Sequence, residues 1–134
     1  MTARRIRTRD LVDHLVSNGQ VNADIQSRLE KTRVHIDDVL IGALRHHGDA
    51  LTREVCATIL GQRRSRSAVP DLLRALSDES DHVRRDALWA IEKAAGLNVG
   101  DLSSALLLNP DDWPEVRRRL QGWWRIVKDD SYFR

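Results

Sequence analysis

The chain has very few of the residues that form disulfide bonds or structural metal sites. With one cysteine in 134 residues, no disulfide can form within the chain, and a zinc site made of several cysteines is excluded. Aromatic residues make up only 4%, and no stretch alternates apolar and polar residues for long, so strand signals are absent. No apolar run approaches the roughly 20 residues of a membrane-spanning helix, and no apolar stretch typical of a secretory signal follows the N-terminal charges. These absences predict one globular domain in the cytoplasm, without a membrane segment.

Charged residues are abundant but nearly balanced in sign. The chain has 22 Lys and Arg against 20 Asp and Glu, a formal net charge of +2, and 19 of the 22 basic residues are arginines. The guanidinium group is a planar fork that suits a carboxylate or a phosphate. A coding bias toward arginine and an ordinary solvated surface of mixed sign are the alternatives. An excess of two charges argues only weakly for a nucleic-acid partner.

The spacing of apolar residues predicts helices almost throughout the chain. Turn residues such as Asn18-Gly19 and His47-Gly48 interrupt the pattern at short, regular intervals. Residues that favour the start of a helix follow these turns. For example, Asp112 and Glu115 have the spacing of a capping box. Eight helices are expected, at about 9–17, 24–33, 37–47, 50–61, 68–77, 81–95, 100–108 and 112–127.

The predicted helices repeat with a fixed period. A shift of 32 residues places Leu40-Ile41 on Leu72-Leu73, and the same shift places Arg53 on Arg85. A period of this length with two helices per unit is typical of a solenoid. Each helical hairpin has an apolar face that it cannot bury alone, so the hairpins stack. The period therefore predicts an α-solenoid of stacked antiparallel hairpins.

One of these units resembles a known repeat. The segment 68–78, AVPDLLRALSD, followed by 83–91, VRRDALWAI, is similar to a HEAT repeat, and more narrowly to the bacterial HEAT-like type named after phycobilisome lyases. The unit at 36–61 matches less well, and the unit at 100–127 has bulky Trp123 and Trp124 where small aliphatic residues are usual. The resemblance implies an all-α, right-handed solenoid. It says little about function, since such repeats serve many roles.

The resemblance also divides the chain into parts. Residues 36–127 are expected to form three HEAT-like hairpins, and residues 128–134 a C-terminal tail. Residues 1–35 match poorly and are expected to form a basic arm with atypical capping helices. The apolar run at 106–108 is too apolar for an exposed helix. Either the tail covers this run, or a second copy of the chain does so in a homodimer through the C-terminal end.

Candidate binding residues lie on the second helix of each hairpin. On a helical wheel, Arg85, Trp89 and Glu92 point away from the core face of helix 81–95. In repeats of this type the second helices line the concave surface, so the resemblance implies that these residues face a groove. Arg53 and Arg118 correspond to Arg85, which predicts a row of three arginines with Trp89 beside the central one. The predicted partner-binding residues are Arg53, Arg85, Trp89, Glu92, Arg118 and Arg125.

The arginines have a structural interpretation as well. The row could consist of solubilising charges paired with acidic residues of the same helices. Arg84 and Arg117 flank the core face and are expected to join hairpins by binding aspartates in the turns. The turn aspartates available to them are Asp49, Asp78 and Asp111.

No pattern of catalytic or metal-binding residues is present in the sequence. The five histidines lie in different helices or turns and lack the spacing of metal ligands. Cys56 takes the repeat position of Leu88, which predicts a buried apolar side chain rather than a nucleophile. No glycine-rich phosphate loop or nucleophile elbow occurs. We therefore expect no catalytic residue, no metal and no cofactor.

Three functions are compatible with this pattern. The first is a non-enzymatic adaptor, regulator or inhibitor that grips an acidic segment of a partner protein or peptide with the arginine row and packs an apolar anchor on Trp89. The second is binding to a nucleic-acid backbone through the same arginines and the basic N-terminal arm. The third, implied by the resemblance alone, is a subunit of a bilin lyase or isomerase. The first is favoured, because 20 acidic residues oppose the second and the single cysteine is expected in the core.

Overall fold

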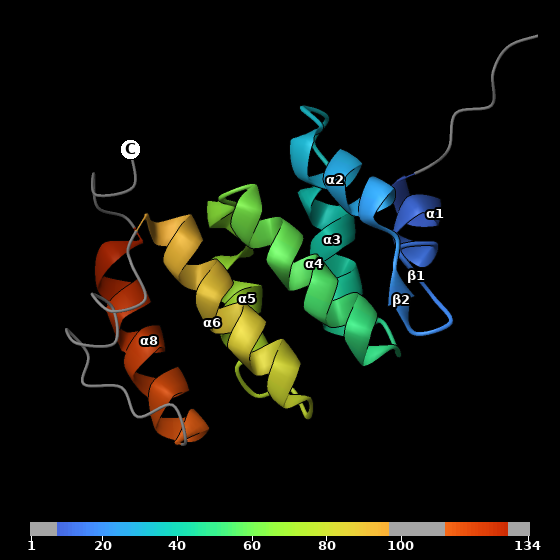
Figure 1. Ribbon diagram of the computed structural model, residues 1–134. Helices are drawn as coiled ribbons and strands as arrows, with labels where there is room; N and C mark the ends of the chain where they lie inside the picture. The colour runs from blue at the N-terminus through green and yellow to red at the C-terminus, as the bar shows by residue number, and fades with distance from the viewer. Residues whose placement is uncertain (1–7, 97–111, 129–134) are drawn as a thin grey trace, which may run out of the picture.

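Helices form nearly all of the regular structure, as the sequence predicts. The computed structural model describes residues 8–96 and 112–128, and every structural statement below concerns these residues. Seven α-helices lie within them, and the further expected helix at 100–108 lies outside (Figure 1). The elements are α1 (Thr8–Asp13), β1 (Val16–Ser17), β2 (Gln20–Val21), α2 (Ala23–Lys31), α3 (Asp37–His46), α4 (Ala50–Gln62), a short 3₁₀ helix (Arg66–Ala68), α5 (Val69–Ala75), α6 (Asp81–Ala95) and α8 (Trp113–Val127).

A small β-hairpin near the N-terminus is the exception to the all-helical expectation. β1 and β2 pair antiparallel, with Val16 opposite Val21. At the tip, Asn18 and Gly19 have φ angles of 53° and 73°. Asn-Gly favours this left-handed geometry in two-residue hairpin turns. The expected helix over 9–17 is therefore wrong beyond Asp13, because the chain turns into the hairpin there.

The central helices stack as two hairpins in two layers. α3 pairs with α4 and α5 with α6, while α4 packs along α6 and α3 contacts α5. In Figure 1, α4 and α6 lie side by side toward the viewer, with α5 behind α6. The described part of the N-terminal region packs on this stack, because α1 contacts α3 and α2 contacts α4. These contacts confirm the predicted α-solenoid architecture.

α8 does not occupy the position expected for the second helix of a third hairpin. Among the described helices its main contact is α5, and it does not pack along α6 as α6 packs along α4. Its two fully buried side chains, Val116 and Leu120, join the common hydrophobic core. Residues of α8 therefore cannot be aligned in space with those of α6 by repeat position alone.

The core lies between the two layers and consists of aliphatic side chains, with Cys56 among them. Burial raises the pKa of the Cys56 thiol to about 12, so the reactive thiolate does not form near neutral pH. This environment confirms the expected apolar role of Cys56. Fully buried members from the central helices are Leu40, Ile59, Leu60, Leu72, Leu76, Val83, Ala87 and Ile91.

Side-chain caps lie at the starts of α4, α6 and α8. The Asp49 carboxylate accepts the Thr52 N–H at 3.2 Å, and the Ser80 hydroxyl accepts the Val83 N–H at 3.4 Å. At α8, Asp112 accepts the Glu115 N–H at 3.2 Å, as the sequence predicts. Glu115 does not complete the capping box, because its carboxylate binds arginines on its own helix instead. These caps set where each long helix begins.

Gly61 lets α4 and α6 approach closely. A Cβ atom at this position would lie 2.8 Å from Cζ3 of Trp89 and 2.9 Å from Cα of Ala90. We expect Gly61→Ala to lower the free energy of unfolding by about 1–2 kcal/mol, because overpacking against backbone outweighs the gain in helix propensity near a helix end. Urea denaturation measures this change.

Gly42 of α3 provides the matched control, since a Cβ atom there meets no other atom within 4 Å. Gly42→Ala should raise the free energy of unfolding by up to about 1 kcal/mol through helix propensity alone. Equal effects of the two substitutions would contradict the close helix contact at Gly61.

Candidate functional site

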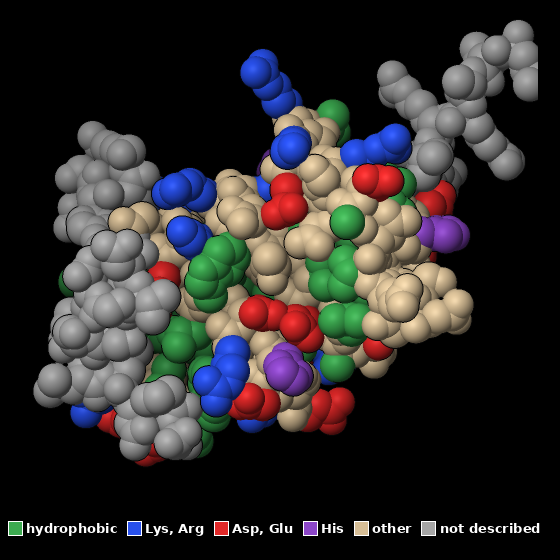
Figure 2. Space-filling view, viewed as in Figure 1, with side chains coloured by type: hydrophobic (Ala, Val, Ile, Leu, Met, Phe, Trp, Pro, Cys, Tyr) green, Lys and Arg blue, Asp and Glu red, His purple; other side chains and the backbone are tan. Residues whose placement is uncertain are grey.

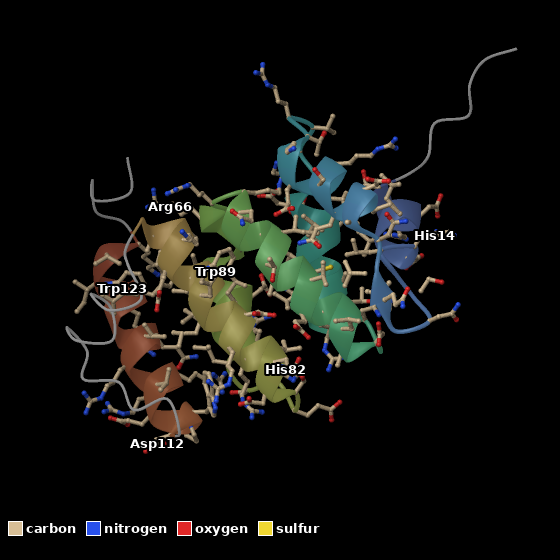
Figure 3. The ribbon with its side chains drawn as sticks, in the orientation of Figure 1. His14, Arg66, His82, Trp89, Asp112 and Trp123 are labelled. Carbon is tan, nitrogen blue, oxygen red and sulfur yellow. The ribbon has the colours of Figure 1, made fainter. Side chains whose placement is uncertain are left out.

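The outer surface of α4 and α6 gathers chemically different side chains in a small area. We call it the α4–α6 face and define it by Glu54, His82, Arg85, Asp86, Trp89 and Lys93. Figure 2 shows apolar, acidic, basic and histidine side chains meeting over these two helices, and Figure 3 places Trp89 and His82 along α6. Such mixed chemistry around an aromatic side chain is typical of interaction surfaces rather than of a purely solvating face.

Trp89 lies across the junction of the two helices. The missing side chain of Gly61 leaves space for its ring on α4, and the ring is only half-buried. Lys93, one turn further along α6, places its Nζ 5.6 Å from the ring centroid. This contact is a cation–π interaction. Trp89 was predicted to point away from the core; its ring is half-buried and packs partly against the core.

Glu54 of α4 and Asp86 of α6 form a pair of carboxyl groups across the same junction. Burial, followed by the charge of Glu54 and a hydrogen bond with it, raises the pKa of Asp86 to about 6, while the charge of His82 acts in the opposite direction. Two like charges at this distance disfavour double ionisation. The negative charge of Asp86 is therefore less favourable here than in a fully exposed carboxylate.

Arg53 is buried and does not reach this face. Its Nε and Nη2 atoms donate to the two carboxylate oxygens of Asp78 at 2.9 and 3.0 Å, and Nη1 donates to the main-chain carbonyl of His47 at 2.8 Å. Burial alone would raise the pKa of Asp78, but hydrogen bonds from Arg53 and from the Ser80 N–H lower it below the usual value. The expectation that Arg53 lines a groove is wrong, because the α5–α6 turn carrying Asp78 lies against this part of α4.

The other two arginines of the expected row are exposed but paired along their own helices. Arg85 donates from Nε to Asp81 at 2.7 Å. Arg118 binds both oxygens of Glu115, at 2.7 and 2.6 Å. Because α8 packs on α5, Arg118 is not in line with Arg85. The expected row of three arginines is therefore not assembled.

Glu92 is the second candidate residue that the structure places in the interior. It is 1% exposed, and neither carboxylate oxygen has a hydrogen-bond partner among residues 8–96 and 112–128. Burial raises the pKa of Glu92 to about 7, partly offset by the charge of Lys93. The expected outward position is wrong, because the side chain of Glu92 lies in the interior. Arg125, by contrast, is exposed beside a hollow between α5 and α8.

Arg84 and Arg117 behave differently from one another. Arg84 donates to the main-chain carbonyl of Asp78 at 2.7 Å and to the Asp81 carboxylate at 3.2 Å, so it does bind the α5–α6 turn. The carboxylate of Asp78 accepts hydrogen bonds from Arg53 instead. Arg117 makes no hydrogen bond or ion pair with the described residues, and Asp111 lies outside them. The apolar run at 106–108, on which the homodimer rests, also lies outside.

Arg63 is an organising residue that sequence reasoning missed. It donates to the Asp37 carboxylate at 2.9 Å and to the carbonyls of Leu29 and Thr32 at 2.9 and 2.8 Å, joining the end of α2 to the start of α3. Asp37 also accepts from the Ser65 hydroxyl. The sequence separation of the partners is the feature that could have indicated this pair, because three arginine–aspartate pairs are 25 or 26 residues apart. These pairs are Arg45–Asp71, Arg53–Asp78 and Arg63–Asp37.

No group of three or more His, Cys, Asp or Glu side chains converges as a metal site requires, in the part of the chain that the structure describes. Within the same residues, no helix has the length and apolar character needed to cross a membrane.

Comparison with known proteins places the chain in a family. The family model for HEAT repeats matches residues 38–121, more than half of the chain. No curated protein and no solved structure matches significantly. The narrower likeness to the phycobilisome-lyase type stays a prediction. The stacked hairpins and the family match together show that the chain belongs to the HEAT-repeat family.

Proposed function

We propose that the protein is a non-enzymatic interaction module that docks a partner protein or peptide on the α4–α6 face. HEAT repeats generally serve as scaffolds for protein interactions. The observation that carries the choice of face is Trp89, a large ring left half-exposed at the junction of two packed helices. Tryptophan is among the residues that most often dominate the binding energy of an interface.

The charges of the face favour a partner with a basic side chain. Asp86 of α6 is partly buried and hydrogen-bonded to Glu54 of α4, and burial followed by the charge of Glu54 raises its pKa. A lysine or arginine of the partner placed between these carboxyl groups would offset the repulsion between them. An acidic partner was expected from the arginine row, but Arg53 is buried, and Arg85 has Asp81 as its counter-ion.

In the described residues, the arginine row does not favour the nucleic-acid alternative. Each member of the arginine row has an acidic partner, namely Asp78, Asp81 or Glu115. The arginines at 4, 5 and 7 of the expected basic arm lie outside the described residues. A cytoplasmic location stays a prediction.

Selection from a peptide-display library tests the proposal. Peptides enriched on the wild-type protein should contain an apolar anchor and a lysine or arginine. Trp89→Ala should weaken their binding by about 30-fold or more, the loss typical of a hot-spot residue. Isothermal titration calorimetry on synthetic peptides measures the change, and thermal unfolding monitors the variant, since Trp89 also packs on Gly61.

Trp123→Ala in α8 is the control, because this ring is also half-buried but lies on a different surface. A Glu54→Gln/Asp86→Asn variant should abolish the preference for basic peptides while retaining the apolar one. Equal loss of binding in the two tryptophan variants, or enrichment of acidic peptides only, would overturn the proposed mode. Duplex DNA binding with a steep salt dependence would revive the nucleic-acid alternative.

A further inference from the structure

A hollow of about 450 Å³ lies between the α5–α6 turn and the first turns of α8. It shares no residue with the α4–α6 face, so an inference about it stands independently of partner docking. In Figure 3, nitrogen-tipped side chains gather between the labelled His82 and Asp112, which mark the starts of α6 and α8. The volume falls within the range of small-molecule sites in proteins.

The lining of the hollow is strongly biased toward positive charge. Three arginines, Arg84, Arg117 and Arg118, border it, and Asp78 is the one acidic residue among the described residues that line it. Both carboxylate oxygens of Asp78 already accept hydrogen bonds from Arg53. Arg118 is paired with Glu115 and Arg84 with Asp81, so Arg117 is the lining arginine that has no carboxylate partner among the described residues.

Two of these arginines carry unsatisfied donors. The Nε atoms of Arg84 and Arg117 are buried and have no hydrogen-bond partner among the described residues. The guanidinium of Arg84 lies 5.4 Å from the ring centroid of Trp113, which holds it in place, and its remaining nitrogens donate to Asp78 and Asp81. A guanidinium group is always charged, and a buried N–H group that is not hydrogen-bonded is unfavourable.

We propose that this hollow binds an oxyanion, the phosphoryl or carboxylate group of a small ligand, between Arg84 and Arg117. An anion placed there accepts hydrogen bonds from the Nη groups of Arg117, which are not among the buried atoms, and supplies the counter-charge that Arg117 lacks. Ser77 and Gln121 add a hydroxyl and an amide to the wall, while Trp113 gives an apolar surface for the rest of the ligand. The hollow is larger than one phosphate ion requires, so it has room for an organic group.

Arg117 also borders a second hollow of about 250 Å³, between α5 and α8. Gln121 lines both hollows, so the two are neighbours on the surface of α8. Arg74 and Arg125 line the second hollow and extend the positive charge away from the proposed oxyanion position. An anionic ligand approaching α8 therefore meets arginines on both sides of Arg117.

Titration with inorganic phosphate and, in parallel, with acetate tests the proposal. Isothermal titration calorimetry should show saturable binding of at least one of the two, and the Nε–Hε resonances of Arg84 and Arg117 should shift in nuclear magnetic resonance spectra. Arg117→Ala should lower the affinity at least tenfold. This variant should fold normally, because Arg117 makes no hydrogen bond with the described residues.

Arg28→Ala is the matched control, since it removes the same charge from an exposed position in α2. Arg117→Lys keeps the charge but loses the planar guanidinium group that can donate two parallel hydrogen bonds. It should weaken binding nearly as much as Arg117→Ala. Binding of phosphate alone identifies a phosphoryl ligand, and binding of acetate alone identifies a carboxylate. Equal weakening by Arg28→Ala and Arg117→Ala, or no saturable binding of either anion in the millimolar range, would overturn the proposal.

Discussion

Replacing Arg53 with alanine should lower the free energy of unfolding by about 3–5 kcal/mol, the cost typical of breaking a buried ion pair from one side. The side chains of Arg53 and Asp78 are 9% and 12% exposed. Without Arg53, the Asp78 carboxylate loses both of its side-chain donors, and the carbonyls of His47 and Gly48 lose theirs. Urea denaturation followed by circular dichroism measures the loss.

Arg85→Ala is the control for this prediction, because Arg85 has the same repeat position. Its ion pair with Asp81 joins side chains that are 56% and 46% exposed. Exposed pairs of this kind contribute about 0–1 kcal/mol. Arg53→Lys should give an intermediate loss, since one ammonium group cannot bind two carboxylate oxygens and a carbonyl with the same geometry. Similar losses for Arg53→Ala and Arg85→Ala would show that Arg53 is not a structural residue.

The second large effect concerns pH and the buried carboxyl of Glu92. Its pKa is about 7 in the folded protein, against an ordinary value of 4.5 in the unfolded chain. Between these values the folded state holds a proton that the unfolded state has released, so raising the pH favours unfolding. We expect Glu92 to remove about 2–3 kcal/mol of stability between pH 4.5 and 7, with no further loss above that range.

Glu92→Gln isolates this contribution, because the amide has nearly the same shape and does not ionise. The variant should be more stable than the wild type at pH 8, and the difference should shrink toward pH 5. Asp86 has a pKa raised to about 6 and also titrates in this window, but it is present in both proteins and cancels in the difference. Chemical denaturation across the pH range provides the measurement.

Glu79→Gln is the matched control, because the Glu79 side chain is 92% exposed. It should leave the pH dependence of stability unchanged. If Glu92→Gln follows the wild-type curve at every pH, Glu92 is ionised at no cost in the folded protein, and its carboxylate has a partner in solution.

The helical architecture could be predicted from the chain because it depends on local and periodic features. The bounds of α6 agree with expectation, and those of α3 and α4 agree to within one residue. Apolar spacing, caps such as Ser80 and the shift of 32 residues all act within one or two helices. The β-hairpin was missed because Asn18-Gly19 serves equally well to end a helix and to join two short strands.

The candidate site was less predictable, because it depends on which surfaces meet. The helical wheel gives Arg53 and Arg85 the same direction, yet one meets the turn aspartate Asp78 and the other faces solvent. The expected alignment of Arg118 with Arg85 assumed that every hairpin stacks alike, whereas α8 packs on α5. For Trp89 the wheel gave an outward direction, whereas the ring is half-buried, because it also packs over Gly61 of α4.

The three arginine–aspartate pairs also bear on how freely the number of repeats can change. Each pair spans 25 or 26 residues and joins a helix or its end to an aspartate well outside it. Deleting one helical hairpin would therefore separate a guanidinium group from its carboxylate, even where the new junction preserved apolar packing. Tandem arrays are commonly lengthened or shortened by whole units, but here such an event requires compensating substitutions at the arginines. The modularity of this solenoid is limited by its charges rather than by its hydrophobic core.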